Sequence, residues 1–146
     1  MEVSGELKVS FDSNYLELGE PPSILGTKCA SCGITIFGKR QTCENCAGTD
    51  VKTVILGNNG TLWSFTVQRY PPAEPFKLGS AKREDWVPRV LGWVELPQGP
   101  RVLSIVENCK PEDAKIGMEV EMFIDKGWLS ENGDEVMILK SRPRVE

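Results

Sequence analysis

The sequence predicts a mostly β protein in which a short zinc ribbon precedes a five-stranded barrel. Two Cys-x-x-Cys pairs lie ten residues apart in the first third of the chain. Five segments rich in β-branched and aromatic residues follow them, separated by turns that contain glycine or proline. At 146 residues, the chain has room for one ordinary domain, or for a very small domain joined to a modest one.

Residues 1–23 predict an extended N-terminal arm. Leu7, Val9 and Phe11 alternate with polar residues, which is typical of a strand with one apolar face. The turn-forming residues 19–23 end this stretch. We expect the arm to pack on the rest of the protein or on a partner.

Residues 24–56 predict the zinc ribbon. A two-residue gap lets both sulfurs of a pair reach one ion, so the expected ligands are Cys29, Cys32, Cys43 and Cys46. Gly33 permits the turn after the first pair, Gly48 lies two positions beyond the second, and the β-branched segments 34–37 and 51–56 supply short strands. Four protein ligands leave no position for water or substrate, so we expect structural zinc, with redox iron or a labile sensor as the alternatives.

Residues 57–146 predict the barrel. The expected strands are residues 60–70, 87–96, 101–109, 119–129 and 135–143. Asn132 and Gly133 supply the positive backbone dihedrals of the last hairpin, and residues 110–118 contain the one expected helical turn. Five strands with a long irregular segment after the first indicate a closed barrel of the oligonucleotide/oligosaccharide-binding (OB) type, although a two-sheet sandwich would look similar at this level.

The first barrel strand alternates along its length. Trp63, Phe65 and Val67 fall on one side. The opposite side carries Leu62, Ser64, Thr66 and Gln68. Alternation of this kind is typical of a strand whose two faces meet different surroundings.

Composition limits the function classes. The chain has no histidine, which removes histidine-based nucleophile pairs and histidine-ligated catalytic zinc. Its net charge of −4 gives no general attraction to phosphate polymers. We find no membrane-length apolar run and no secretory signal, and we expect a cytoplasmic protein. The unpaired Cys109 is expected to be a small residue at the core edge, and we assign no catalytic residue.

The segment 70–89 is long for a connection within a compact barrel, which is typical of a functional loop or a disordered one. Aromatic faces beside cations suit an adenine ring and phosphates, as in a nucleotide-bearing cofactor or a single nucleic-acid strand. The candidates for contacts with such a ligand or with a partner are Arg69, Phe76, Lys77, Lys82, Arg83, Trp86 and Arg89. A solvated loop with aromatic residues packed on the barrel explains the same residues equally well.

Five motifs together resemble a known family. In order, they are LGTKCASCG, CENC, GTLWSFTVQRY, VPRVLGWVELPQGPRVLSIV and KIGMEVEMF. Their order and spacing over residues 25–123 resemble the small acyl-CoA-associated proteins built from a rubredoxin-like zinc ribbon followed by an OB-fold domain. Many members of that family carry an amphipathic helix where residues 1–24 stand.

The resemblance implies a non-catalytic accessory subunit that binds a thiolase-fold subunit in a hetero-oligomer. The larger subunit would supply the catalytic residues for thiolytic cleavage of a 3-oxoacyl-CoA by CoA, and the present chain would help to form the acyl-CoA site. Its size and extended arm are most similar to the small subunits of benzoylsuccinyl-CoA thiolases of anaerobic toluene degradation. We expect Ile34, Ile36 and Phe37, which lie between the knuckles, to face the partner.

Two other functions compete with this hypothesis. Zinc ribbons and OB folds also occur in modules that bind single-stranded nucleic acid, but the net charge of −4 disfavours phosphate-driven binding. A small enzyme that acts alone on acyl-CoA is the second alternative. Turnover by the purified chain would distinguish it from an accessory subunit.

Overall fold

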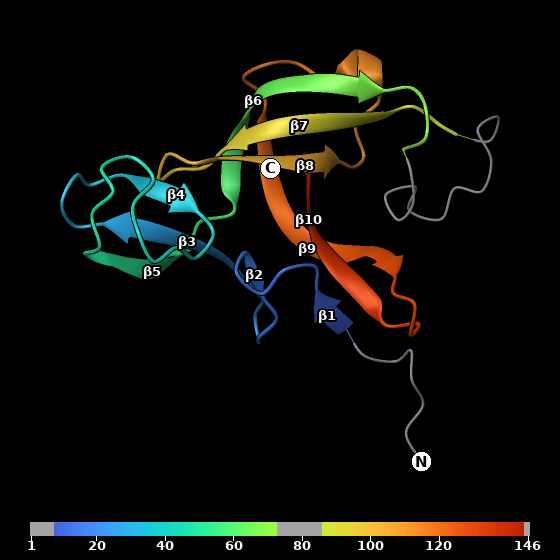
Figure 1. Ribbon diagram of the computed structural model, residues 1–146. Coiled ribbons are helices and arrows are strands. Elements are labelled where there is room, and N and C mark those ends of the chain that lie inside the picture. The colour runs from blue at the N-terminus through green and yellow to red at the C-terminus, as the bar shows by residue number, and fades with distance from the viewer. Residues whose placement is uncertain (1–7, 73–85, 145–146) are drawn as a thin grey trace.

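The computed structural model describes residues 8–72 and 86–144 and is almost entirely β. A six-stranded sheet contains β1 (Lys8–Ser10), β6 (Asn59–Gln68), β7 (Arg89–Glu95), β8 (Arg101–Val106), β9 (Glu119–Leu129) and β10 (Glu135–Pro143). A smaller sheet contains β2 (Leu16–Glu17), β3 (Ser23–Cys29), β4 (Thr35–Phe37) and β5 (Val51–Leu56). The smaller sheet lies to one side of the larger one (Figure 1).

Strands β6 to β10 form a closed five-stranded barrel, as the sequence predicts. The strand order is β10-β8-β7-β6-β9, and β9 closes the ring by pairing with β10 as well. The last two strands have the bounds that their alternation predicts. The expected helical turn is a single 3₁₀ turn, η2 (Pro111–Asp113). In the last hairpin only Gly133 has a positive φ, at 86°, while Asn132 does not.

The arm is paired to both sheets. β1 lies parallel to the start of β10, with Val9 opposite Val136. β2 pairs with β3 in the smaller sheet, and the side chain of Leu16 is fully buried. Residues 8–17 therefore join the two sheets, and a position N-terminal to the cysteines contributes to the core.

One hydrophobic core extends from the smaller sheet into the barrel. Leu16, Ile24 and Leu56 come from the smaller sheet and its flank, and they pack in the same cluster as the inward side chains of the barrel. The barrel contributes Leu62, Val90, Val94, Val102, Val106, Val120, Met122 and Leu139 among others. Each Å² of apolar surface that this core removes from water contributes about 25 cal/mol, and the burial stabilises both parts together.

A β-bulge changes the faces of β6 from those that simple alternation predicts. Leu62 is opposite Val94 and Ser64 is opposite Trp93, so Trp63 is the extra residue. Trp63 is 46% exposed, whereas Phe65 packs against the core. The expectation that Trp63 and Phe65 share a face is wrong, because the bulge shifts the alternation by one residue.

No helix in the described part of the chain has the length and apolarity that a membrane span needs.

Candidate metal centre and the junction cleft

The four predicted cysteines meet at the end of the smaller sheet. Cys29 ends β3, and the N–H of Gly33 donates to its carbonyl at 2.9 Å to form the first knuckle. The second knuckle repeats this bond, from the N–H of Ala47 to the carbonyl of Cys43 at 2.8 Å. Gly33 has φ 81° and Ala47 has φ 63°. The left-handed position of the second knuckle is therefore occupied by alanine, and Gly48 follows it.

The sulfur atoms are spaced as a metal requires. All four Sγ atoms lie within 4.8 Å of one another. Cys29 and Cys46 are 3.7 Å apart at their sulfurs, and Cys32 and Cys43 are 3.6 Å apart. Tetrahedral zinc with Zn–S bonds of about 2.3 Å separates its sulfurs by about 3.8 Å, whereas a disulfide brings them to about 2.05 Å. The residues present fit a tetrahedral ion, and all four cysteines are free.

Local hydrogen bonds prepare some of these thiols for a cation. The side-chain amide of Asn45, 3.5 Å from Cys32 Sγ, and then the N–H of Ile34 lower the pKa of Cys32 to about 6. The N–H of Gly48 lowers the pKa of Cys46, but the neighbouring sulfurs and burial outweigh it and raise that pKa to about 11. Four thiols at this distance resist losing all their protons together, and a divalent cation would remove that repulsion.

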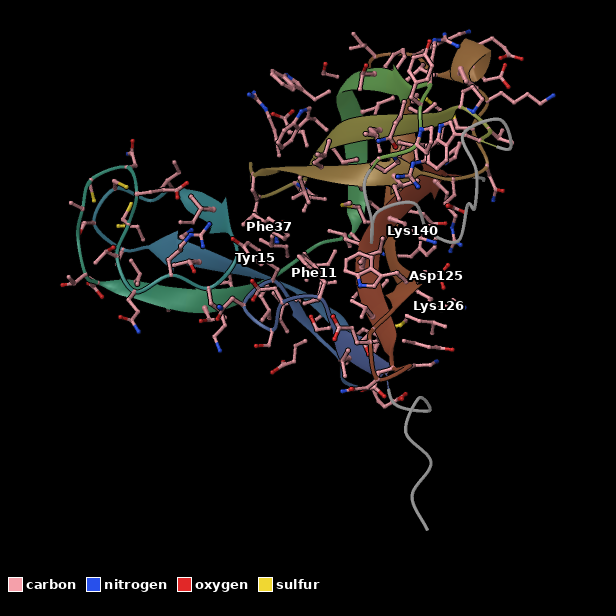
Figure 2. The ribbon with its side chains drawn as sticks, turned by 45° about the vertical axis from the view of Figure 1, so that its right-hand side comes forward. Phe11, Tyr15, Phe37, Asp125, Lys126 and Lys140 are labelled. Carbon is pink, nitrogen blue, oxygen red and sulfur yellow. The ribbon has the colours of Figure 1, made fainter. Side chains whose placement is uncertain are left out.

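Three aromatic side chains connect the arm, the smaller sheet and the barrel. The ring of Tyr15 stacks on Phe11 at 5.9 Å between centroids and lies 4.7 Å from Phe37. Figure 2 shows the three where the smaller sheet meets the barrel. Gly38 has φ 92°, and a Cβ there would lie 2.5 Å from the ring of Tyr15. The guanidinium of Arg40 lies over this ring, with its Cζ 5.5 Å from the ring centroid.

A hollow of about 770 Å³ opens at this junction, and we name it the junction cleft. Its walls include β4, the turn of the β7–β8 hairpin and the arm, with Ile34, Trp93 and Leu103 among the lining residues. A second hollow of about 440 Å³, the β8 groove, continues it across β8 toward Arg89 and Trp128. The two hollows share Phe11, Phe37, Val102 and Leu103, so they form one continuous surface.

The three residues predicted to face a partner all line the junction cleft but differ in exposure. Ile34 is 39% exposed, Ile36 is buried at 8%, and Phe37 packs against the core. A polar residue in place of Ile36 would disturb the fold of the smaller sheet itself. The predicted contact is therefore best tested at Ile34.

The structure brings together two of the loop residues predicted to contact CoA. The guanidinium of Arg89 lies 4.7 Å from the ring of Trp86, and both side chains bond to Gln68. Burial lowers the pKa of Arg89, and the charge of Glu107 opposes this shift. Arg69 instead lines a separate shallow hollow with Val87. Four further candidates, Phe76, Lys77, Lys82 and Arg83, lie outside the described residues.

Cys109 lies apart from the metal centre. Its side chain is partly buried against the core, and its thiol is 3.6 Å from the carbonyl of Lys110. Burial, followed by the charge of Asp113, raises the pKa of this thiol. A thiol with a raised pKa is a poor nucleophile at neutral pH.

Several residues of the junction cleft were not predicted from the sequence. Trp93 and Leu103 are exposed at 43% and 50% on the outer face of the barrel, and apolar side chains that adjoin one another on a surface commonly mark a contact. They are paired directly across β7 and β8. Alternation along residues 87–96 and 101–109 could have indicated their exposure. It places Trp93 on the same face as Glu95, and Leu103 on the same face as Arg101.

Comparison with known proteins places the fold in a family. Residues 53–125, half of the chain, match the family model described as the ChsH2 C-terminal OB-fold domain. A DUF35 domain-containing scaffold protein of Methanothermobacter thermautotrophicus is 32% identical over 127 residues, which cover 84% of this chain and 88% of the relative. The chain belongs to the DUF35 family of OB-fold proteins. Its four cysteines and five-stranded barrel agree with the family that its motifs resemble.

One further relative and one solved structure of similar fold carry the names of enzymes. The benzoylsuccinyl-CoA thiolase subunit BbsA of Thauera aromatica is 28% identical over 126 residues, covering 86% of this chain and 78% of BbsA. A chain of the Ltp2-ChsH2(DUF35) aldolase matches with a TM-score of 0.62 at 23% sequence identity, over 84% of this chain and 86% of that one. The second match concerns the fold alone. A relative of this DUF35 protein is thus named as a subunit of a thiolase.

Proposed function

We propose that this DUF35 protein is a non-catalytic accessory subunit of a thiolase-type enzyme complex. The observation that carries the proposal is the similarity to BbsA, which covers 86% of the chain and so extends over both the smaller sheet and the barrel. The exposed apolar surface of the junction cleft supports it. Apolar patches that remain on the surface of a single chain commonly mark contacts with another protein.

The four-cysteine centre would hold structural zinc. Cys29, Cys32, Cys43 and Cys46 would complete a tetrahedral shell, with no ligand position left for a substrate. Zinc would supply folding free energy to the smaller sheet and no chemical step. The knuckles would then keep β4 and its Ile34 in place at the wall of the junction cleft.

The partner subunit would carry the nucleophile and the bases. The reaction in this proposal is thiolytic cleavage of a 3-oxoacyl-CoA by CoA in the cytoplasm, with benzoylsuccinyl-CoA of anaerobic toluene degradation as the specific substrate. Arg89 and Trp86 offer a cation and an aromatic face to the nucleotide of CoA, and Arg69 a further cation. Phe76, Lys77, Lys82 and Arg83 remain candidates of the same kind.

Purification of the tagged chain from its native host tests this function. We expect a thiolase-type subunit to co-purify in a fixed ratio, identified by mass spectrometry. Ile34→Asp should weaken the complex by about tenfold or more, since it places a charge in an apolar contact. The matched control Ile116→Asp changes a residue that is 70% exposed and does not line the junction cleft, and it should leave the complex intact.

A different result would contradict the proposal in a recognisable way. A chain that emerges alone and monomeric under gentle conditions is not an accessory subunit. Salt-dependent binding of a single-stranded oligonucleotide at micromolar concentration would indicate the nucleic-acid module instead. Thiolytic turnover by the purified chain alone would indicate an independent enzyme.

A further inference from the structure

Strand β8 has an unusual edge. On one side it pairs with β7 along its whole length, from Arg101 to Val106. On the other side its only strand partner among the described residues is β10, and that pairing covers Ile105 and Val106 alone. Residues 101–104 are therefore bordered by the two hollows and by no described strand.

The hydrogen-bond pattern shows which backbone groups face that open edge. The N–H of Leu96 donates to the carbonyl of Pro100 at 2.9 Å, so these two residues form a hydrogen-bonded pair at the hairpin end. Such pairs alternate along an antiparallel ladder. The pair of Trp93 with Leu103 is then of the non-bonded type, and the N–H and C=O of Leu103 point away from β7. Ile105, two residues on, has the same orientation and pairs with Lys140 of β10.

The arm explains why the edge stays open. The carbonyl of Met137 on β10 accepts a hydrogen bond from the N–H of Phe11 at 3.0 Å. Strand β10 thus changes its partner from β8 to the arm between residues 140 and 137. The gap left between β8 and the arm is the β8 groove, which is lined by apolar side chains from both sides.

The surface has a chemistry that selects one kind of occupant. Backbone groups at an open strand edge pair with another extended backbone, and apolar walls accept alternate apolar side chains. Two arginines line the junction cleft, and each has an acidic partner on this chain: Arg40 Nε lies 3.8 Å from Glu44 and Arg101 Nε lies 3.2 Å from Glu95. Both pairs are exposed to solvent and contribute little, so an acidic side chain on an extended segment would take the place of Glu44 or Glu95 beside these arginines at small cost.

We propose that an extended, apolar segment of the partner subunit, with an acidic residue beside Arg40 and Arg101, adds as a strand to the open edge of β8 at Arg101–Ser104. This inference rests on the proposed function, because the segment belongs to the thiolase-type partner. The segment lies in the β8 groove and the junction cleft, and the N–H and C=O of Leu103 bond to its backbone. Phe11 and Phe37 pack on its side chains.

Two substitutions at one position separate backbone pairing from side-chain packing. Leu103→Pro and Leu103→Ala both shorten the side chain, but only proline also removes the N–H that points into the groove. Proline is tolerated on an edge strand where its missing N–H faces no neighbour, so the isolated variant should fold. We expect Leu103→Pro to bind the co-purified partner about tenfold more weakly than Leu103→Ala does.

Hydrogen exchange provides a second measurement that needs no variant. In the free chain the amide of Leu103 should exchange rapidly, and in the complex with the partner its exchange should slow by about tenfold or more. This measurement keeps the inference testable if Leu103→Pro does not fold. The amide of Val102, which faces β7, should be protected in both states and serves as the internal reference.

The results distinguish failure of the strand addition from failure of the accessory function. Equal affinities of the two Leu103 variants, or unchanged exchange at Leu103 in a stable complex, overturn strand addition while the accessory function stands. Absence of any thiolase-type partner overturns both. If light scattering finds a dimer of this chain that Leu103→Pro dissociates, the edge pairs with a second copy, and the assignment of the segment to the partner is wrong.

Discussion

At the scale of single residues, the two cysteine knuckles differ at one backbone position. The residue after the second cysteine of each knuckle has a positive φ, 81° at Gly33 and 63° at Ala47. Glycine adopts this conformation freely, whereas a residue with a Cβ is disfavoured by roughly 1–2 kcal/mol. The second knuckle is therefore strained in a way that the first is not.

This difference predicts opposite effects from reciprocal substitutions. Ala47→Gly should raise the free energy of unfolding by about 0.5–1 kcal/mol, and Gly33→Ala should lower it by about 1 kcal/mol. A Cβ at Gly33 meets no atom within 4 Å, so only the backbone strain is measured. Denaturant unfolding of the metal-loaded protein provides the comparison. Destabilisation by Ala47→Gly would show that φ does not set the cost at these positions.

The sequence predicts the clustering of the four cysteines well and the backbone around them less well. The Cys-x-x-Cys spacing identifies all four sulfurs because the constraint is local: two residues between ligands permit one geometry. The same local argument favours glycine in the second turn, yet Ala47 has the positive φ and Gly48 follows it. Alanine is tolerated there because the surrounding hydrogen bonds, such as that from Cys43 N–H to Gly48 carbonyl at 2.8 Å, fix the turn.

At the scale of strands, the antiparallel pair β9–β10 carries a row of ion pairs. Lys140, Arg142 and Arg144 of this region bond to Asp125, Glu121 and Glu119 respectively. Lys140 differs from the others because its side chain is largely buried, with Nζ 3.3 Å from Asp125 and 3.7 Å from Glu107. Figure 2 shows Lys140 and Asp125 on the barrel, with Lys126 nearby.

The pair of Asp125 with Lys140 predicts a dependence of stability on pH. Burial raises the pKa of Asp125, but the N–H of Lys126 and the charge of Lys140 outweigh it, so the pKa lies below its usual value. A carboxyl whose pKa is lowered on folding stabilises the fold above the pKa of the unfolded chain, about 3.9, and loses this effect as the pH falls through the folded value. Asp125→Asn should therefore destabilise the protein slightly at pH 6 and not at all in strong acid.

Denaturant unfolding of both proteins at a series of pH values measures this difference. The expected effect is below about 1 kcal/mol, because Asp125 is half exposed and solvent screens the pair. In a Lys140→Met background, the pH dependence of the same substitution should be smaller. A difference between wild type and Asp125→Asn that stays constant from neutral pH to strong acid would exclude the pair as its source.

The bounds of a strand could be predicted where apolar and polar residues alternate without a break. The facing of its side chains and the pairing of its edges could not be predicted where they depend on a partner strand distant in sequence. Residues 119–129 and 135–143 were predicted with their observed bounds. The bulge at Trp63 arises from the register between β6 and β7, which no local pattern contains. The open edge of β8 likewise depends on Phe11 bonding to Met137, more than a hundred residues away in sequence. Non-local pairing of this kind requires the structure.

At the scale of the whole molecule, the smaller sheet and the barrel share one core. The division of the chain at residues 56 and 57 follows the motifs, and it remains a prediction. Leu16, Ile24 and Leu56 pack on the barrel residues, so unfolding of the smaller sheet would expose apolar surface of the barrel as well. The metal centre is therefore expected to support the barrel from a distance.

Metal removal tests the identity of the ion and this coupling in one experiment. Elemental analysis of the isolated protein should find one zinc per chain, and iron in preparations from the native host would contradict the assignment. All four tryptophans lie beyond residue 57, so tryptophan fluorescence, excited apart from tyrosine, reports on that part of the chain. Chelation should lower the free energy of unfolding followed by this signal by about 3 kcal/mol, a fraction of the roughly 10–16 kcal/mol with which structural sites bind zinc. A fluorescence transition that chelation leaves unchanged would mean that the barrel is stable without the ribbon, and that the shared core contributes little to it.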